Sequence, residues 1–280
     1  MRALYCRTSS GFQRCICTYN QRVILAKIKV LGAFGSRGIS RNTTCIQLSQ
    51  DAVIDAGNII DGLGEAALAI DHIFVTHCHF DHLLDIPFLI DTFYAKRDKP
   101  IRIYGLAETL MDIRKHILNN LIWPDFSHIK LLGKSVDAIE FIEIEIGKTY
   151  TFDSFDIKPI KTEHSVVSCG YVVTKGNSSI LISADTYLCD DIVSEVNSNQ
   201  DISTVILECS FPNSLSRLAE VSKHLTPSTL SKLILGFSRN VEIYINHLKP
   251  NNELEILHDI TMYENLKKAV VLYDMMDVEF

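Results

Sequence analysis

Residues 75–84, VTHCHFDHLL, place three histidines and one aspartate within six positions, directly after the apolar run IFV. Imidazole and carboxylate groups that are buried at the end of a strand need polar partners, and a metal ion can supply them. Neutral imidazole nitrogens and carboxylate oxygens are natural ligands for zinc and similar divalent ions. Four such groups exceed what one tetrahedral ion usually takes from a single loop. The segment therefore predicts two ions that divide His77, His79, Asp81 and His82 between them.

Two ions need more ligands than this loop provides, and three polar residues elsewhere close strand-like segments. His164 closes FDIKPIKTEH, Asp185 closes SSILISAD and His247 closes VEIYINH. Loops that follow strands are where α/β proteins expose functional side chains. One histidine at a strand end is usually an ordinary residue, but three such positions in a chain with this loop indicate further ligands.

Strand-like and helix-like segments alternate along the chain, which predicts one α/β domain without an internal repeat. Short apolar runs indicate strands at 22–32, 43–57, 72–76, 100–105, 170–175, 178–185, 203–210, 241–247 and 268–274. Residues 139–161 alternate as two or three antiparallel strands. Helical patterns cover 61–70, 83–96, 106–120, 187–199 and 251–265, and two helices are expected within 214–236.

The composition is that of a soluble globular protein, because 47% of the 280 residues are apolar and 22% are charged. No apolar run reaches the length of about 18 residues that a membrane-spanning helix needs. The formal net charge is −7, although residues 1–50 contain no acidic residue, so the rest of the chain is strongly acidic. An acidic body argues against a large nucleic acid substrate. The eight cysteines form no CxxC pair, which favours reduced thiols in a reducing compartment such as the cytoplasm.

The first 22 residues contain Arg, Ser and Thr but no acid. They lack the long apolar core of a secretory signal, which argues against export. A mitochondrial presequence, a poorly ordered extension and translation from an upstream start all fit this composition. We therefore expect an extension at 1–22 and a single domain at 23–280, in the cytoplasm unless the extension directs the chain to mitochondria.

The ligand pattern resembles that of metallo-β-lactamase-fold hydrolases, whose signature is HxHxDH followed by an isolated His, an Asp and a final His. HCHFDH matches the signature, and VIDAG matches the early Asp-x-Gly element of that family. The resemblance implies a four-layer αβ/βα sandwich in which Asp55 supports the metal loop. It also implies one ion on His77, His79 and His164, a second on Asp81, His82 and His247, and a bridging Asp185.

Residues 28–260 further resemble the class II 3′,5′-cyclic-nucleotide phosphodiesterases, chiefly in HILNNLIWPDFS, SKHLTP and NHLKP. The resemblance implies hydrolysis of cyclic AMP or cyclic GMP to nucleoside 5′-monophosphates by a hydroxide generated between two divalent ions. Zinc is the expected metal, with manganese and iron(II) as alternatives. The expected partner is the small cyclic nucleotide, with no nucleic acid and no membrane, and a second copy of the chain, in a homodimer, is a further candidate partner. Cys78, Phe80 and Asp85 stand where that branch usually has Ser, Leu and a small residue.

His224 precedes a predicted helix start in SKHLTP, where Thr226 is a suitable N-cap and Pro227 a suitable first residue. Related tRNA-processing endonucleases carry a similar histidine that is supported by a glutamate after an earlier strand. Glu208 in VILECS matches that glutamate. By this resemblance Glu208 orients His224, which contacts the phosphate or protonates the leaving oxygen. The predicted catalytic residues are His224, Glu208 and Asp81.

Three other functions remain open. An RNA-processing endonuclease of the same superfamily would need a basic surface for tRNA, and a thioester or lactone hydrolase would not need Glu208 and His224. A non-catalytic metal-binding module would be expected to have broken ligand positions. Measuring metal content and turnover of phosphodiester, thioester and lactone substrates separates the four functions.

Overall fold

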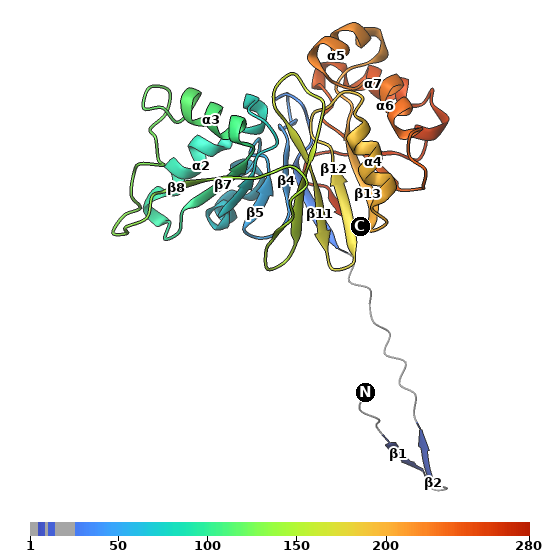
Figure 1. Cartoon of the computed structure of the whole chain (residues 1–280), viewed down its shortest axis with the longest axis horizontal. Coiled ribbons are helices and arrows are strands. Elements are labelled where there is room, and N and C mark those ends of the chain that lie inside the picture. Colours follow the sequence, from blue (N-terminus) through green and yellow to red (C-terminus); the bar gives the residue numbers. More distant parts are fainter. Residues whose placement is uncertain (1–4, 9–10, 15–25) are drawn as a thin grey trace.

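The computed structural model describes residues 5–8, 11–14 and 26–280 (Figure 1). In the N-terminal part, β1 (Tyr5–Thr8) and β2 (Gly11–Arg14) pair as antiparallel strands. The predicted boundary at residue 23 and most of the predicted extension at 1–22 lie outside the described residues. No helix in the described part of the chain is both long and apolar enough to cross a membrane.

The first of two large sheets comes mainly from the N-terminal half. Its strand order is β16-β3-β4-β5-β6-β7-β8, antiparallel from β16 to β5 and parallel from β5 to β8. The strands are β3 (Lys27–Gly32), β4 (Cys45–Gln47), β5 (Ala52–Ile54), β6 (His72–Phe74), β7 (Ile101–Gly105), β8 (Ile139–Glu143) and β16 (Asp277–Glu279).

The second sheet comes from the C-terminal half and has the order β15-β14-β13-β12-β11-β10-β9. Strands β9 to β12 are antiparallel, whereas β12 to β15 are parallel. The strands are β9 (Tyr150–Thr151), β10 (Asp156–Lys161), β11 (Cys169–Lys175), β12 (Ser178–Ile182), β13 (Ile202–Glu208), β14 (Glu242–Asn246) and β15 (Val270–Val271).

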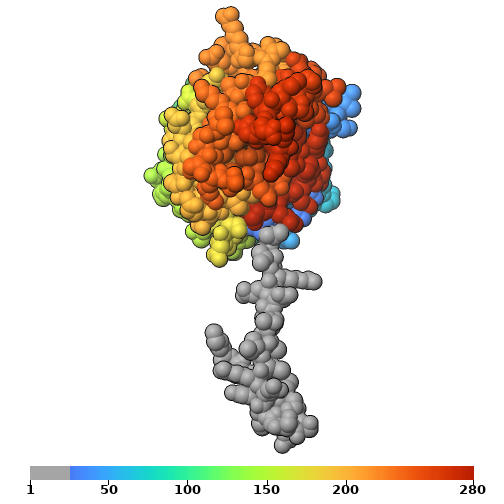
Figure 2. Space-filling view, turned by 90° about the vertical axis from the view of Figure 1, so that its right-hand side faces the viewer, coloured from blue at the N-terminus to red at the C-terminus, as the bar shows by residue number. Residues whose placement is uncertain are grey.

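Helices cover the outer face of each sheet, so that the layers run helix, sheet, sheet, helix (Figure 1). The first sheet carries α1 (Ile60–Leu63), α2 (Asp85–Phe93) and α3 (Ala107–His116), and the second carries α4 (Asp190–Ser198), α5 (Ser216–Ser222), α6 (Pro227–Ile234) and α7 (Glu253–Ile260). Short 3-10 helices are η1 (Gly64–Ala69), η2 (Phe80–His82), η3 (Tyr94–Lys96), η4 (Asn213–Leu215), η5 (Pro250–Asn252) and η6 (Glu264–Leu266). Figure 2 shows the C-terminal segments, in orange and red, closing over one side of the molecule.

Two buried apolar clusters hold these layers together. The larger one joins the facing sides of the two sheets to the underside of the C-terminal helices, and includes Phe34, Phe74 and Tyr171. The smaller one lies between the first sheet and helices α2 and α3. Tyr171, which is fully buried, donates a hydrogen bond to the carbonyl of Val75 at 2.8 Å. The two sheets are therefore tied at the point where β6 leaves the core.

Several sequence predictions need correction. Residues 139–161 do form three strands, but β8 pairs in parallel with β7 in the first sheet, while β9 and β10 pair in the second. Residues 61–70 form one α-turn followed by a 3-10 helix, because Gly64 at φ +57 ends the α-helix. Strand β16 was not predicted at all. Periodicity identifies a strand but does not name its partner, which is a long-range property.

Candidate metal centre

The HCHFDH loop begins three residues after β6 ends, and a buried aspartate holds Thr76, the residue directly before the loop. Asp55 follows β5 and is fully buried. Its carboxylate accepts hydrogen bonds from the Thr76 backbone at 2.9 Å and from the Thr76 hydroxyl at 2.9 Å. The same carboxylate lies 2.6 Å from Nδ1 of His82. Asp55 therefore fixes both ends of the loop, in the supporting position that its motif implies.

The second sheet supplies the opposing side chains from one edge. Because β12, β13 and β14 are parallel, their carboxyl ends meet at the same edge. Asp185 follows β12 by three residues, Glu208 ends β13 and His247 directly follows β14. His164 follows β10 in a loop that approaches the same point. All seven predicted ligands thus meet between the two sheets.

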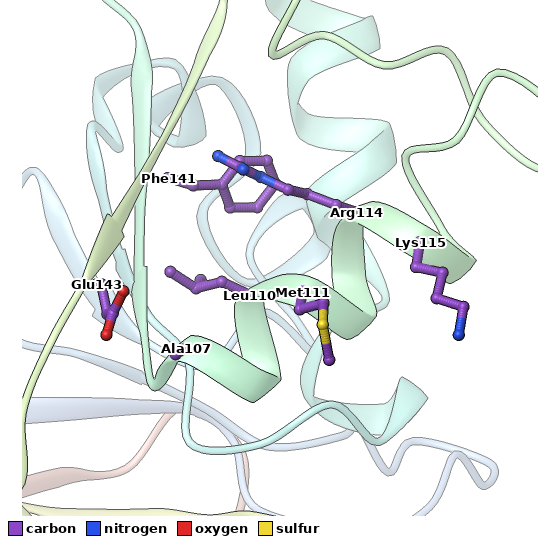
Figure 3. Close-up of a pocket in the computed structure, with 7 residues that line it drawn as sticks. All are labelled: Ala107, Leu110, Met111, Arg114, Lys115, Phe141 and Glu143. Atoms are coloured by element: carbon purple, nitrogen blue, oxygen red, sulfur yellow. The ribbon is translucent and has the colours of Figure 1, made fainter.

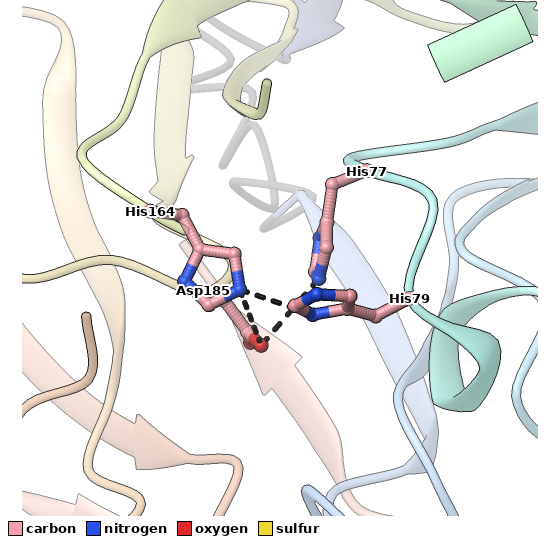
Figure 4. Close-up of side chains that lie close together, drawn as sticks. All are labelled: His77, His79, His164 and Asp185. Carbon is pink, nitrogen blue, oxygen red and sulfur yellow. Dashed lines mark hydrogen bonds and ion pairs between the residues drawn. The ribbon is translucent and has the colours of Figure 1, made fainter. Parts of the chain in front are cut away.

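Four side chains form a first group of potential ligands (Figure 4). Nε2 of His77 lies 3.6 Å from Oδ2 of Asp185, and Nε2 of His164 lies 3.8 Å from the same oxygen. Nε2 of His164 is also 3.1 Å from Nδ1 of His79. Ligand atoms around a tetrahedral ion with bonds near 2.1 Å are separated by about 3.4 Å. The spacing therefore fits one divalent ion.

A second group lies directly beside the first. Nε2 of His82 and Nε2 of His247 are 3.3 Å apart. Oδ2 of Asp81 lies 3.8 Å from the former and 3.5 Å from the latter. Asp185 also belongs here, because its Oδ1 is 3.0 Å from Nε2 of His247 and its Oδ2 is 3.5 Å from Nε2 of His82. Asp185 therefore faces both groups, as a bridging carboxylate must.

Two buried polar atoms in the described residues of this centre have no hydrogen-bond partner, namely Nε2 of His77 and Oδ1 of Asp185. An unpaired buried polar atom is costly, and native proteins usually satisfy it. Both atoms belong to the potential ligand groups. An ion would satisfy them, so the residues present fit two divalent ions held by imidazole and carboxylate.

The electrostatics of the two groups differ. Burial, together with neighbouring imidazoles, lowers the pKa of His77 well below its usual range, and burial lowers the pKa of His79 and of His164. Burial also disfavours charged His247, but Asp185 and Asp81 outweigh it and raise its pKa to about 9. The first group thus presents neutral imidazoles, which is the form that binds metal. In the second group the carboxylates favour a protonated His247, so a metal ion that binds there would displace this proton.

His224 lies next to this centre and is held by Glu208. Its Nδ1 is 2.7 Å from Oε1 of Glu208 and 4.0 Å from Oδ2 of Asp185. Both His224 and Glu208 are buried. As predicted, Pro227 begins α6 and Thr226 is its N-cap; Thr226 also forms a capping box with Thr229. The helix start therefore fixes the approach of His224 to the site.

Ser210 is a contributor that the sequence patterns did not single out. Its hydroxyl lies 2.8 Å from Glu208, 3.1 Å from Nδ1 of His224 and 2.9 Å from Nδ1 of His247. It therefore links the predicted acid–base pair to a predicted ligand. The available signal was its position two residues after Glu208, which places both side chains on the same face of an extended segment. The sequence patterns did not single out Gly35 either. A Cβ at this position would lie 2.5 Å from the ring of His247, so the site needs a glycine here.

Four residues around the centre adopt left-handed backbone conformations without being glycine. They are Asp55, Ala184, Lys223 and His247, with φ values of 58, 54, 59 and 63°. Such conformations are disfavoured for residues with a Cβ, and they concentrate at functional sites because the surrounding fold enforces them. Here each is a predicted ligand, the supporting Asp55, or the residue directly before a predicted ligand or catalytic residue.

Replacing Asp55 with asparagine should weaken metal binding without emptying the whole centre. The ring of His82 would lose its carboxylate partner, and such a change typically reduces metal affinity by roughly 10–100-fold. Titration of metal-free protein with zinc should show the weakening in one of two binding steps. Asp91→Asn, which changes an exposed acid on α2, is the matched control. Two unaltered binding steps in Asp55→Asn would contradict the supporting role.

The cysteines and Trp123, which the sequence analysis also considered, are not among the potential metal ligands. All five cysteines among residues 26–280 are free thiols. Trp123 packs edge-on against Phe88 at 5.2 Å between ring centres. A separate surface pocket of about 430 Å³ lies between α3 and β8, where Arg114 covers the ring of Phe141 (Figure 3). None of the metal-centre residues lines that pocket.

Comparison with known proteins identifies relatives whose sequences match about half to two thirds of this chain. Ribonuclease Z of Haloarcula marismortui is 31% identical over 159 residues, which cover 52% of this chain and 47% of that protein. The 3′,5′-cyclic-nucleotide phosphodiesterase 1 of Saccharomyces cerevisiae is 23% identical over 211 residues, which cover 68% of this chain and 57% of that protein. The matches thus span about half the length of these curated relatives.

Solved structures agree over a larger part of the chain. Unliganded yeast PDE1 has a TM-score of 0.77 at 17% identity, and the match covers 91% of this chain and 99% of that one. The metallo-β-lactamase fold protein YhfI from Bacillus subtilis has a TM-score of 0.71 at 17% identity, with 91% and 98% covered. The predicted metallo-β-lactamase fold is therefore confirmed. Residues 31–265 match the family described as Anti-Pycsar protein Apyc1, and the chain belongs to that family.

Proposed function

We propose that this protein is a metal-dependent phosphodiesterase that hydrolyses 3′,5′-cyclic nucleotides to nucleoside 5′-monophosphates. The observation that carries the proposal is the pair of His224 and Glu208, 2.7 Å apart and directly beside the bridging position of Asp185. Cleavage of a phosphodiester expels an alkoxide, which departs more easily when a positioned acid protonates it. A hydrolase that acts on better leaving groups has less need of such a pair.

The seven ligands would hold two divalent ions, which supply an activated water and neutralise charge on the phosphoryl group. The chain's own residues have the remaining tasks. Nδ1 of His224 is occupied by Glu208, so its Nε2 is the atom free to face the substrate. A proton on Nε2 passes to the 3′-oxygen as the bond between phosphorus and that oxygen breaks. Glu208 fixes the ring, and Ser210 joins this pair to His247.

An RNA-processing endonuclease is the second candidate, and the 31% identity to a Ribonuclease Z favours it. The two substrates share the same phosphodiester chemistry but differ in size and charge. A polyanionic RNA binds through basic surface, and the net charge of −7 favours a small substrate with a single negative charge.

Turnover of cyclic AMP and cyclic GMP by metal-replete protein tests the proposal directly. We expect both to be converted to 5′-monophosphates, identified by chromatography against 3′-monophosphate standards. Precursor tRNA is assayed in parallel at the same enzyme concentration. Cleavage of precursor tRNA without turnover of either cyclic nucleotide would reject the phosphodiesterase and favour the endonuclease.

A further inference from the structure

A pocket of about 500 Å³ opens beside the second group of potential ligands. Asp81, a member of that group, forms part of its wall. The wall also contains two cationic side chains, Arg37 and Lys249, and the hydroxyl-bearing side chain of Ser36. A pocket that joins a predicted metal ligand to two cations is suited to an anion that extends outward from the reactive centre.

Contacts between two distant segments hold both cations beside His247. The amide of Gly35 donates a hydrogen bond to the carbonyl of Leu248 at 3.2 Å. In return, the ammonium of Lys249 donates a hydrogen bond to the carbonyl of Gly35. Arg37 follows Gly35 by two residues, and Lys249 follows His247 by two residues. Both cations are therefore attached to backbone that is fixed next to the second group of potential ligands.

Neither cation is engaged in a strong ion pair. Nη2 of Arg37 lies 3.5 Å from Oδ2 of Asp61, and both side chains are mostly exposed. Exposed pairs of this kind contribute little, so the guanidinium can turn to a ligand. The ammonium of Lys249 has three donors, and the carbonyl of Gly35 accepts one of them. Both side chains therefore have donors left for an anion.

The pocket lies at a different part of the centre from the proposed proton donor. Asp81 lines the pocket, whereas His224 does not. The leaving oxygen has to meet His224, which leaves the pocket for the part of the substrate that stays attached to phosphorus. For a linear nucleotide diester, that part is the nucleoside that keeps the 5′-phosphate.

Two cations in one small pocket select an anion with more than one charge. A phosphate monoester carries a charge of roughly −1.5 to −2 at pH 7 and has three acceptor oxygens. Guanidinium and ammonium groups bind such oxygens through charge-assisted hydrogen bonds. The net charge of the chain is −7, but salt screens charges beyond about 8 Å, so the nearest cations dominate within the pocket.

We propose that this pocket binds a second phosphate, carried by the nucleoside that stays attached to the scissile phosphorus. The inference rests on the proposed phosphodiester hydrolysis and extends it to a further substrate class, linear nucleotide diesters that bear a 3′-phosphate. Water adds to the scissile phosphorus, and the bond from phosphorus to the leaving oxygen breaks. The products are the free alcohol and a nucleoside 3′,5′-bisphosphate, whose second phosphate remains on Arg37 and Lys249.

Two matched substrates test the proposal, namely the p-nitrophenyl ester of thymidine 5′-monophosphate with and without a 3′-phosphate. Their scissile bond and leaving group are identical, so their kcat/KM values differ only through the second phosphate. Metal-replete wild-type protein should prefer the 3′-phosphorylated ester by roughly 10–100-fold, as expected for hydrogen bonds between charged groups. Arg37→Gln should lower this ratio by roughly tenfold, and so should Lys249→Gln. Added salt should lower the ratio in the wild type.

Calorimetric titration gives a readout that does not depend on turnover. Thymidine 3′,5′-bisphosphate should bind roughly 10–100-fold more tightly than thymidine 5′-monophosphate, and Arg37→Gln should remove most of this difference. Arg114→Gln is the matched control, since Arg114 is an exposed arginine that lines the separate pocket between α3 and β8. Metal content is measured for every variant, so that a lost ion is not mistaken for a lost phosphate contact.

The possible failures of the inference can be told apart. Equal kcat/KM for the two esters, with equal affinity for the two nucleotides, would reject the second-phosphate site and leave the phosphodiesterase intact. An equal loss on both esters in Arg37→Gln would place Arg37 at the scissile phosphate and would also overturn the inference. If wild-type protein hydrolysed neither ester nor cyclic AMP, the proposed function would fail, and the calorimetric comparison would still decide whether the site exists.

Discussion

Replacing Asp185 with alanine is expected to empty both metal positions and to abolish hydrolysis. Its two carboxylate oxygens lie 3.0 to 3.8 Å from imidazole nitrogens of His77, His82, His164 and His247. Asp185 belongs to the potential ligand group of His77, His79 and His164, and also to a group with His224 and His247. The loss of activity should exceed the roughly 10²–10⁴-fold effect of a positioned acid–base group. Elemental analysis of purified Asp185→Ala should find less than one ion per chain.

His164→Ala provides the comparison for this variant. His164 belongs only to the first group, so its removal should empty one position and retain the other. Circular dichroism and a thermal melt establish that both variants are folded. Full metal content in a folded Asp185→Ala would show that the bridge has been assigned to the wrong residue.

Replacing His224 with alanine should leave metal content unchanged and lower turnover of a cyclic nucleotide by roughly 10²–10⁴-fold. A proton donor matters less when the leaving group is stable as an anion. The loss should therefore be much smaller for bis(p-nitrophenyl) phosphate, whose p-nitrophenolate departs without protonation. Glu208→Gln should show a milder form of the same pattern, because an amide can still orient the ring. His258→Ala, which removes an exposed histidine on α7, is the control.

Three other outcomes would assign His224 differently. Equal losses on both substrates would indicate phosphate binding. Loss of one ion would make His224 a ligand, and its proximity to Asp185 and His247 permits that geometry. Unchanged activity would remove His224 from the mechanism and leave it as a residue that packs before helix α6.

The metal loop could be predicted from sequence because its residues are adjacent and its chemistry is unusual. Asp185 and His247 could be predicted because each lies within three residues of the end of a strand, and parallel strands bring their ends together. Asp55 became recognisable only through its motif. In all these cases, a local pattern carried the information.

What could not be predicted depends on contacts between distant segments. Residues 139–143 alternate like their successors, yet they pair with β7 because the preceding loop returns them to the first sheet. Ser210 is an ordinary serine until His224 and His247 lie on either side of it. A pocket lined by Phe80, Asp112 and Ile113 likewise exists only because α3 lies beside the metal-binding loop. The periodicity and spacing of a sequence do not indicate which distant segments come into contact.

Because the ribosome synthesises the chain from its N-terminus, the contacts that complete the first sheet and the metal centre can form only late in synthesis. Strand β3 pairs with β16, and Asp274 accepts a hydrogen bond from Ala33, 241 positions earlier. Likewise, His82 lies beside His247, which is synthesised 165 residues later. At 5–20 residues per second, roughly 10–30 s separate those two histidines during synthesis. Throughout that interval the nascent loop lacks the C-terminal side chains that complete its potential ligand groups, so the two proposed ions could be bound tightly only after the C-terminal half has been synthesised and has folded.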